Sequence, residues 1–157
     1  FQQKHLSQRV ARILQDCGLA PEYLELELTE SVVMRDAETT IGTMGMLKGV
    51  GVGLSLDDFG TGYSSLSQLK HLPLDKLKID QSFVRGLPDD QDDLAISTAI
   101  MGMGKALRLR VIAEGVETEG QLEVLRSGGC DEIQGYLVAK PFPASDFARF
   151  VREKSSL

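Results

Sequence analysis

The strongest constraint on the fold is a repeated succession of a short, strand-like apolar segment and a longer, helix-like one. Five such units follow a first helix predicted from Leu6 to Gly18, and their strands begin near residues 24, 52, 76, 110 and 132. The spacing of about 27 residues is typical of βα units. Because such units join parallel strands through right-handed crossovers, the sequence predicts an α/β fold around a parallel sheet.

Local signals define the predicted elements. The strands are placed at 24–29, 50–56, 77–79, 110–113 and 132–134, and helices at 37–47, 65–70, 94–107, 118–127 and from Ser145 onward. Thr118 followed by Gln121 predicts a capping box, and Gly128 with Gly129 predicts the end of that helix. The acidic run 89–93 precedes a helix, so we interpret it as charge that complements the helix dipole.

Composition excludes several classes of protein. The chain has 157 residues, of which 42% are hydrophobic, and this suits one domain with a single core. A net charge of −6 argues against binding a DNA or RNA polymer through a broad basic field. No apolar run approaches the roughly 20 residues of a membrane span. Cys17 and Cys130 are too few for a zinc module and are predicted to be buried free thiols, so we expect a cytoplasmic location.

Polar side chains gather where the predicted strands end. They are Glu27 and Glu30 at the first strand, Asp57 and Asp58 at the second, Lys78 and Asp80 at the third, Glu114 and Glu117 at the fourth, and Gln134 at the fifth. Since the carboxyl ends of parallel strands open on one face, where ligands bind, we expect one site there. Several carboxylates with one lysine suit Mg²⁺ or Mn²⁺, and two such ions can promote phosphoryl transfer.

Individual residues allow simpler interpretations. The pair Asp57–Asp58 could form a turn and a helix cap, Glu27 could be solvated, and Lys78 could either snorkel or lie buried beside carboxylates. Adjacent strand residues point to opposite faces, so both aspartates can reach one site only if the backbone turns, which the glycines in 59–62 permit. The two histidines lack partners at catalytic spacing and receive no role.

Six motifs occur in one order along the chain. They are LELELTES at 24–31, DDFGTGYSSL at 57–66, LPLDKLKID at 72–80, VIAEGVET at 111–118, DEIQG at 131–135, and Lys140-Pro141. Together they resemble the EAL-domain family of bacterial cyclic di-GMP phosphodiesterases. The resemblance implies a TIM-like (β/α)₈ barrel that linearises cyclic di-GMP with two Mg²⁺ or Mn²⁺ ions.

The resemblance also implies roles for single residues. Glu27, Asp57, Asp58 and Glu114 correspond to metal ligands, and Lys78 and Glu114 to catalytic residues that position or activate the attacking water. Gln134 would support the substrate and the metals, and Glu30 would anchor the mobile loop 57–66. Glu117 and Asp80 would bind substrate or support the residues in contact with it.

The chain matches only part of that family's domain. It begins after the family's Glu-Ala-Leu motif and after the asparagine of the next strand, which are both metal ligands, and it holds five βα units where a barrel needs eight. We therefore expect residues 1–157 to be the C-terminal portion of an EAL domain, inactive alone and with an open sheet edge. The family also suggests a homodimer and an upstream sensory or diguanylate cyclase domain, in a parent protein that can be attached to a membrane.

Two other functions are compatible with part of the pattern. A sensor of the same fold would bind cyclic di-GMP without hydrolysing it. A phosphoacceptor receiver domain also has five parallel strands, an acidic pocket and a lysine, but it carries the acidic pair on its first strand and the lysine on its last. Here the pair Asp57–Asp58 lies on the second predicted strand and Lys78 on the third.

Overall fold

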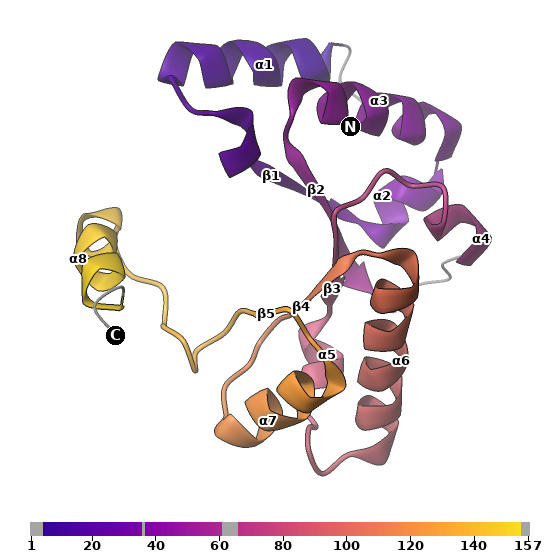
Figure 1. The fold of residues 1–157 in the computed structure, drawn as a ribbon, viewed down its shortest axis with the longest axis vertical. Helices are drawn as coiled ribbons and strands as arrows, with labels where there is room; N and C mark the ends of the chain where they lie inside the picture. The colour runs from indigo at the N-terminus through magenta and orange to yellow at the C-terminus, as the bar shows by residue number, and fades with distance from the viewer. Residues whose placement is uncertain (1–4, 36, 61–65, 155–157) are drawn as a thin grey trace.

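A five-stranded parallel sheet forms the centre of the molecule. The computed structural model describes residues 5–35, 37–60 and 66–154. The strands are β1 (Glu25–Thr29), β2 (Gly53–Phe59), β3 (Lys76–Ile79), β4 (Arg110–Ala113) and β5 (Glu132–Ile133), and they lie side by side in the order of the sequence (Figure 1). A doubly wound receiver fold has the order 2-1-3-4-5, so the sequential order rules out that alternative.

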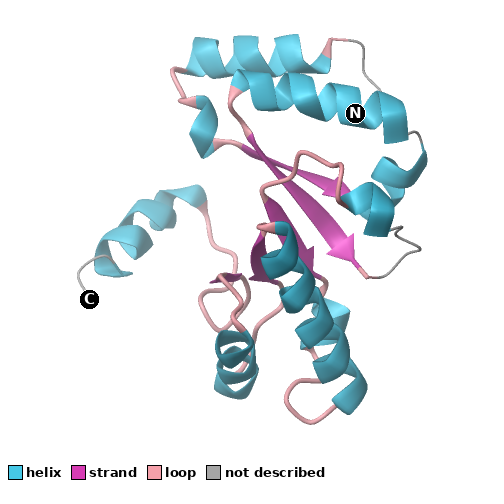
Figure 2. Ribbon diagram, turned by 45° about the vertical axis from the view of Figure 1, so that its right-hand side comes forward, coloured by secondary structure: helices cyan, strands magenta, loops and turns pink. Residues whose placement is uncertain are grey.

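Helices connect the strands, as the sequence predicts. They are α1 (Leu6–Cys17), η1 (Pro21–Tyr23), α2 (Glu30–Arg35), α3 (Ala37–Val50), α4 (Leu66–Leu69), α5 (Gln81–Val84), α6 (Gln91–Leu107), α7 (Glu119–Gly128) and α8 (Ala144–Lys154). The short elements η1, α2 and α5 were not predicted, because three to six residues give at most a weak helical periodicity. In both views α8 stands apart from the other helices (Figures 1 and 2).

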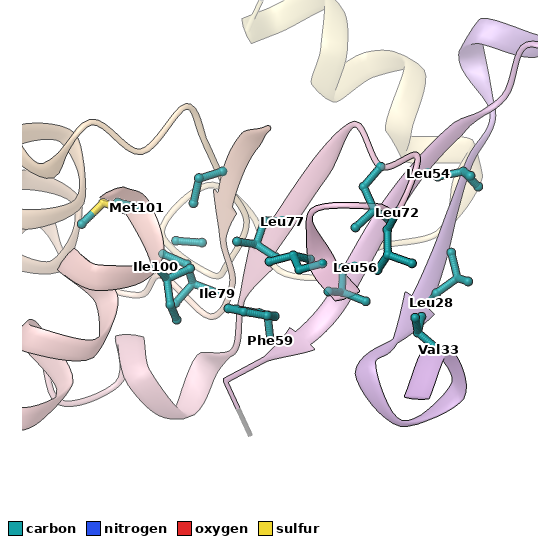
Figure 3. Packing of buried hydrophobic residues seen from close by; sticks show 14 of the residues in the cluster. Leu28, Val33, Leu54, Leu56, Phe59, Leu72, Leu77, Ile79, Ile100 and Met101 are labelled. Atoms are coloured by element: carbon teal, nitrogen blue, oxygen red, sulfur yellow. The ribbon is translucent and has the colours of Figure 1, made fainter. Parts of the chain in front are cut away.

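The hydrophobic core lies between the sheet and its helices. Alternate residues of the strands, among them Leu54, Leu56, Leu77 and Ile79, are fully buried, and helices α3 and α6 pack against β2, β3 and β4 (Figure 3). Because strand side chains alternate between faces, the intervening residues lie on the opposite face of the sheet. That face is polar: it carries Ser55 on β2 and two lysines on β3.

Two aspartates set the register at the amino ends of two strand pairs, each through two reciprocal hydrogen bonds. The Leu54 amide donates to Asp75 Oδ2 at 2.8 Å, and the Asp75 amide donates to the Leu54 carbonyl at 2.8 Å. The Val111 amide likewise donates to Asp131 Oδ2 at 2.7 Å, and the Asp131 amide returns a bond of 3.0 Å to the Val111 carbonyl. An aspartate just before β3 and β5 thus joins each of them to the preceding strand.

Helix ends follow the predicted chemistry. Thr118 and Gln121 form a capping box, Gly129 ends α7 in the left-handed conformation, and Asp90 caps α6 by accepting from the Asp92 and Asp93 amides. The predicted burial of the two cysteines was wrong for Cys17, which is exposed at the last position of α1, and Cys130 is only partly buried; both are free thiols. None of the helices among the described residues could span a lipid bilayer.

Candidate functional site

A β-bulge brings the two adjacent aspartates to the carboxyl end of β2. Leu56 pairs with Leu77 and Phe59 with Ile79, so β2 contains one more residue than β3 over this stretch. Asp58 has φ 55°, a left-handed conformation that aspartate adopts more readily than most residues, and its amide donates to Asp57 Oδ1 at 3.1 Å. The backbone therefore turns at Asp58, inside the strand, and not first at the following glycines. Gly62 lies outside the described residues.

Lys78 is the centre of the site. Its side chain is 4% exposed, and Nζ lies 2.7 Å from Glu27 Oε1, 3.1 Å from Asp57 Oδ1 and 2.5 Å from Glu114 Oε1. Of the two interpretations of Lys78, the structure selects burial beside carboxylates. The three acidic residues come from β1, from β2 and from the position after β4, so one ammonium group connects three neighbouring segments.

The charges of this cluster shift one another's pKa values. Burial alone lowers the pKa of Lys78, but hydrogen bonds to Glu114, Glu27 and Asp57 outweigh it and raise that pKa above its ordinary value. The pKa of Glu114 is raised by burial and by the negative charges of Asp57 and Glu27, despite the opposing effect of Lys78. Burial, with the charges of Asp57 and Asp80, also raises the pKa of Asp58. A cation brought to these carboxylates would relieve the crowding of negative charge.

Two more predicted residues lie close to this cluster. Asp80 contacts Asp58 and caps α5 by accepting from the Ser82 amide at 2.9 Å. Glu30, at the start of α2, is 4% exposed and accepts from the Gly60 amide at 3.3 Å through Oε2. Glu30 therefore holds the point where β2 continues into the segment 61–65, which lies outside the described residues.

Two further predicted residues are placed at the same end of the sheet but outside the Lys78 cluster. Gln134 follows β5. Its backbone amide donates to the Ala113 carbonyl at 2.8 Å, and its side chain is exposed. Glu117 lies exposed in the loop after β4, and its amide donates to Gln121 Oε1 at 2.7 Å. Among the contacts between described residues, none joins the Gln134 or Glu117 side chain to Lys78.

A second charged layer surrounds Lys76, closer to the amino ends of the strands than the Lys78 cluster. The sequence patterns did not predict it. Lys76 Nζ is 3.0 Å from Glu25 Oε2 and 2.7 Å from Glu132 Oε2, and Arg110 Nη1 is 2.9 Å from Glu132 Oε1. Lys76 is two residues before Lys78, and this spacing alone could have placed it on the same face. Burial lowers its pKa, but hydrogen bonds to Glu132 and Glu25 outweigh it, so the pKa of Lys76 is raised.

The donor set suits hard divalent cations by its chemistry. Carboxylate oxygens are the ligands that Mg²⁺ and Mn²⁺ prefer, and the acidic side chains around Lys78 already surround a positive charge. Within the described part of the chain, no three acidic, histidine or cysteine side chains converge as a ready ligand group for one ion. Three of the carboxylates point at the ammonium of Lys78, so ion binding would require them to exchange this partner.

Known proteins share this arrangement of elements. The sequence model of the EAL domain family matches residues 1–141 of the chain. The chain is 47% identical over 147 residues to the cyclic di-GMP phosphodiesterase NbdA of Pseudomonas aeruginosa, covering 94% of this chain and 19% of NbdA. The chain belongs to the EAL domain family. EAL domains are TIM-like barrels, so the five βα units and the preceding helix α1 are part of a TIM-like (β/α)₈ barrel.

Solved structures agree with this assignment. The PaMucR phosphodiesterase in complex with cyclic di-GMP is 46% identical, superimposes with a TM-score of 0.89, and is matched over 93% of this chain and 59% of its own. Klebsiella pneumoniae BlrP1 with manganese and cyclic di-GMP is 31% identical, with a TM-score of 0.82, over 89% of this chain and 36% of its own. MucR of Pseudomonas aeruginosa, 51% identical over 127 residues (81% of this chain and 18% of MucR), is named a bifunctional diguanylate cyclase and cyclic di-GMP phosphodiesterase. The chain spans about a fifth of the length of these curated relatives.

Proposed function

We propose that this chain carries most of the active site of a phosphodiesterase that hydrolyses cyclic di-GMP to the linear dinucleotide. The observation that carries the proposal is the convergence of Glu27, Asp57 and Glu114 on the buried Lys78 at the carboxyl ends of the strands. EAL relatives named for this activity and a relative in complex with the nucleotide support the same substrate. The face is the one at which parallel α/β barrels carry their active sites.

In this proposal four carboxylates would hold two divalent ions, Mg²⁺ or Mn²⁺. They are Glu27, Asp57, Asp58 and Glu114. When bound, such ions supply an activated water and neutralise charge that develops on the phosphate. The manganese complex of BlrP1 supports the choice of a divalent ion.

The remaining residues of the cluster would orient the reactants. Lys78 is buried with its Nζ in contact with three carboxylates, and its ammonium carries three N–H donors, so we assign it the role of positioning the attacking water. Glu30 would fix the chain directly after β2 through the Gly60 amide. Gln134 and Asp80 would contact or support the substrate from the ends of β5 and β3.

The site would be completed by segments beyond this chain. Five strands are fewer than the eight of a closed barrel, and the chain covers 59% of the PaMucR structure. We propose that residues 1–157 are the C-terminal part of an EAL domain, that preceding residues of the encoded protein supply the remaining ligands, and that the domain works as a homodimer. A sensory or diguanylate cyclase domain upstream and a cytoplasmic location belong to the same proposal.

Chromatography of cyclic di-GMP incubated with the encoded protein and Mn²⁺ or Mg²⁺ tests this function. We expect a linear dinucleotide product and a loss of kcat of about 100-fold or more in Glu114→Gln, because the substitution removes a charged ligand next to the reacting water. Glu123→Gln, an exposed change on α7, is the matched control and keeps the activity. The isolated chain 1–157 should give no turnover.

Two outcomes would contradict the proposal. If the nucleotide binds but stays intact in every variant, the protein is a sensor of the same fold and not an enzyme. If Glu114→Gln hydrolyses cyclic di-GMP as fast as Glu123→Gln does, hydrolysis takes place at another site.

A further inference from the structure

A cavity lies at the amino ends of β4 and β5, at the end of the sheet opposite the proposed active site. Its volume is about 280 Å³, and its walls come from the second half of α6, the start of β4 and the end of α7. Met101, Leu109 and Val111 line its apolar part, and Lys105 and Asp131 bring opposite charges to it. The volume is just below the range of about 300–1,000 Å³ found for small-molecule pockets, so the cavity suits a small ligand.

The same two types of charged residue pair directly in an equivalent part of the chain. Lys48, in the last turn of α3, is six residues before Leu54. Asp75, just before β3, accepts from the Leu54 amide at 2.8 Å. Lys48 Nζ lies 2.8 and 2.7 Å from the two carboxylate oxygens of Asp75, so the ion pair in this unit is closed.

The later unit has the same residues at the same places but lacks the ion pair. Lys105, in the last turn of α6, is six residues before Val111. Asp131, just before β5, accepts from the Val111 amide at 2.7 Å. Among the described residues, no ion pair reaches Lys105 or Asp131. Two opposite charges therefore line one cavity without pairing, at the place where the earlier unit has a closed ion pair.

Glycines shape the wall of the cavity between α6 and α7. A Cβ at Gly128 would overlap the end of the Met101 side chain, so this glycine lets the buried Met101 lie against the end of α7. A Cβ at Gly102, in contrast, would meet no atom within 4 Å, although Gly102 also lines the cavity. Position 102 can therefore carry a larger side chain that fills the cavity while the surrounding core stays in place.

We propose that this cavity binds a free α-amino acid with an aliphatic side chain. The carboxylate of the ligand would pair with the Lys105 ammonium, and its ammonium would pair with the Asp131 carboxylate. The aliphatic side chain would lie against Met101 and Leu109. A simple anion would be repelled by Asp131 and a simple amine by Lys105, so a ligand with both charges fits best. The inference does not depend on the proposed hydrolysis of cyclic di-GMP.

Isothermal titration calorimetry of the encoded protein with L-leucine as the probe tests the inference. We expect saturable binding with a Kd of about 1 mM or below, and about 10-fold weaker binding in Lys105→Met and in Asp131→Asn, because each substitution removes one charge-assisted contact. The asparagine keeps an oxygen that can accept from the Val111 amide, so this variant changes the charge and preserves the register.

Filling the cavity is a second test that leaves both charges in place. We expect Gly102→Phe to abolish the binding of L-leucine, because the ring would occupy the space of the ligand. Gly45→Phe is the matched control and should bind as the wild type does. Gly45 is an exposed glycine on α3, and a Cβ there would also meet no atom within 4 Å.

Two analogues of L-leucine test the class of ligand. 4-Methylpentanoate lacks the ammonium group and 3-methylbutylamine lacks the carboxylate, so we expect each to bind at least about 10-fold more weakly. If either analogue binds as tightly as L-leucine, the cavity does not recognise both charges and the inference is wrong. It is also wrong if L-leucine shows no saturable binding, or if Lys105→Met and Gly102→Phe bind it as the wild type does.

Discussion

At the scale of single residues, the chemistry of the site depends on how much positive charge lies between its carboxylates. Lys78 is buried, whereas the side chain of Glu27 is half exposed and that of Glu114 is 21% exposed. The contacts with ionised carboxylates offset the free-energy cost of burying the Lys78 ammonium. This holds only while those carboxylates stay ionised. Without the ammonium, three carboxylates would repel one another at short distance.

Replacing Lys78 tests how much its positive charge among the carboxylates stabilises the fold. We expect Lys78→Met to lower the free energy of unfolding at pH 7 by about 2 kcal/mol, less than the 3–5 kcal/mol of fully buried pairs because Glu27 is half exposed. The deficit should shrink as the pH falls and the unpaired carboxylates become protonated. Urea denaturation at several pH values, with the exposed Lys70→Met as reference, measures it. A deficit that does not depend on pH would show that packing, and not charge, is lost.

At the scale of elements, the sequence predicts the strands and helices better than the details that build the site. Alternation and capping signals identify β1 and α7. They do not reveal the bulge at Asp58, because a bulge depends on how β2 pairs with β3 and not on β2 alone. The short helix α5, which lines a polar cavity, is fixed by the cap at Asp80 and has too few residues to show a clear period.

The second charged layer gives a prediction for three strands at once. Lys76 on β3 joins Glu25 on β1 to Glu132 on β5, and its raised pKa means that the folded state binds its proton more tightly than the unfolded state. This stabilisation is complete below the unfolded value of about 10.5 and is lost as the pH rises through the higher folded value.

Lys76→Met should therefore lower the free energy of unfolding by about 1 kcal/mol at pH 7, and the difference from wild type should narrow above pH of about 10.5. Denaturant unfolding of both proteins between pH 7 and pH 11 measures the difference. A difference that widens with pH would contradict the assignment of these ion pairs.

At the scale of the whole molecule, the sheet curves enough for its first and last strands to reach the same lysine. Glu25 and Glu132 lie on β1 and β5, at opposite ends of the strand order, yet both contact Lys76. The sequence predicts a parallel sheet and the residues at its carboxyl ends. It cannot predict this second layer, because alternation assigns a face to each side chain and says nothing about curvature across five strands.

In the proposed function, divalent ions bind where the carboxylates surround Lys78. The most direct measurement is anomalous X-ray scattering at the manganese edge from crystals of the encoded protein grown with Mn²⁺ and cyclic di-GMP. We expect manganese peaks in bonding contact with oxygens of Asp57, Asp58, Glu27 and Glu114. Manganese bound elsewhere, with these carboxylates still paired to Lys78, would contradict it.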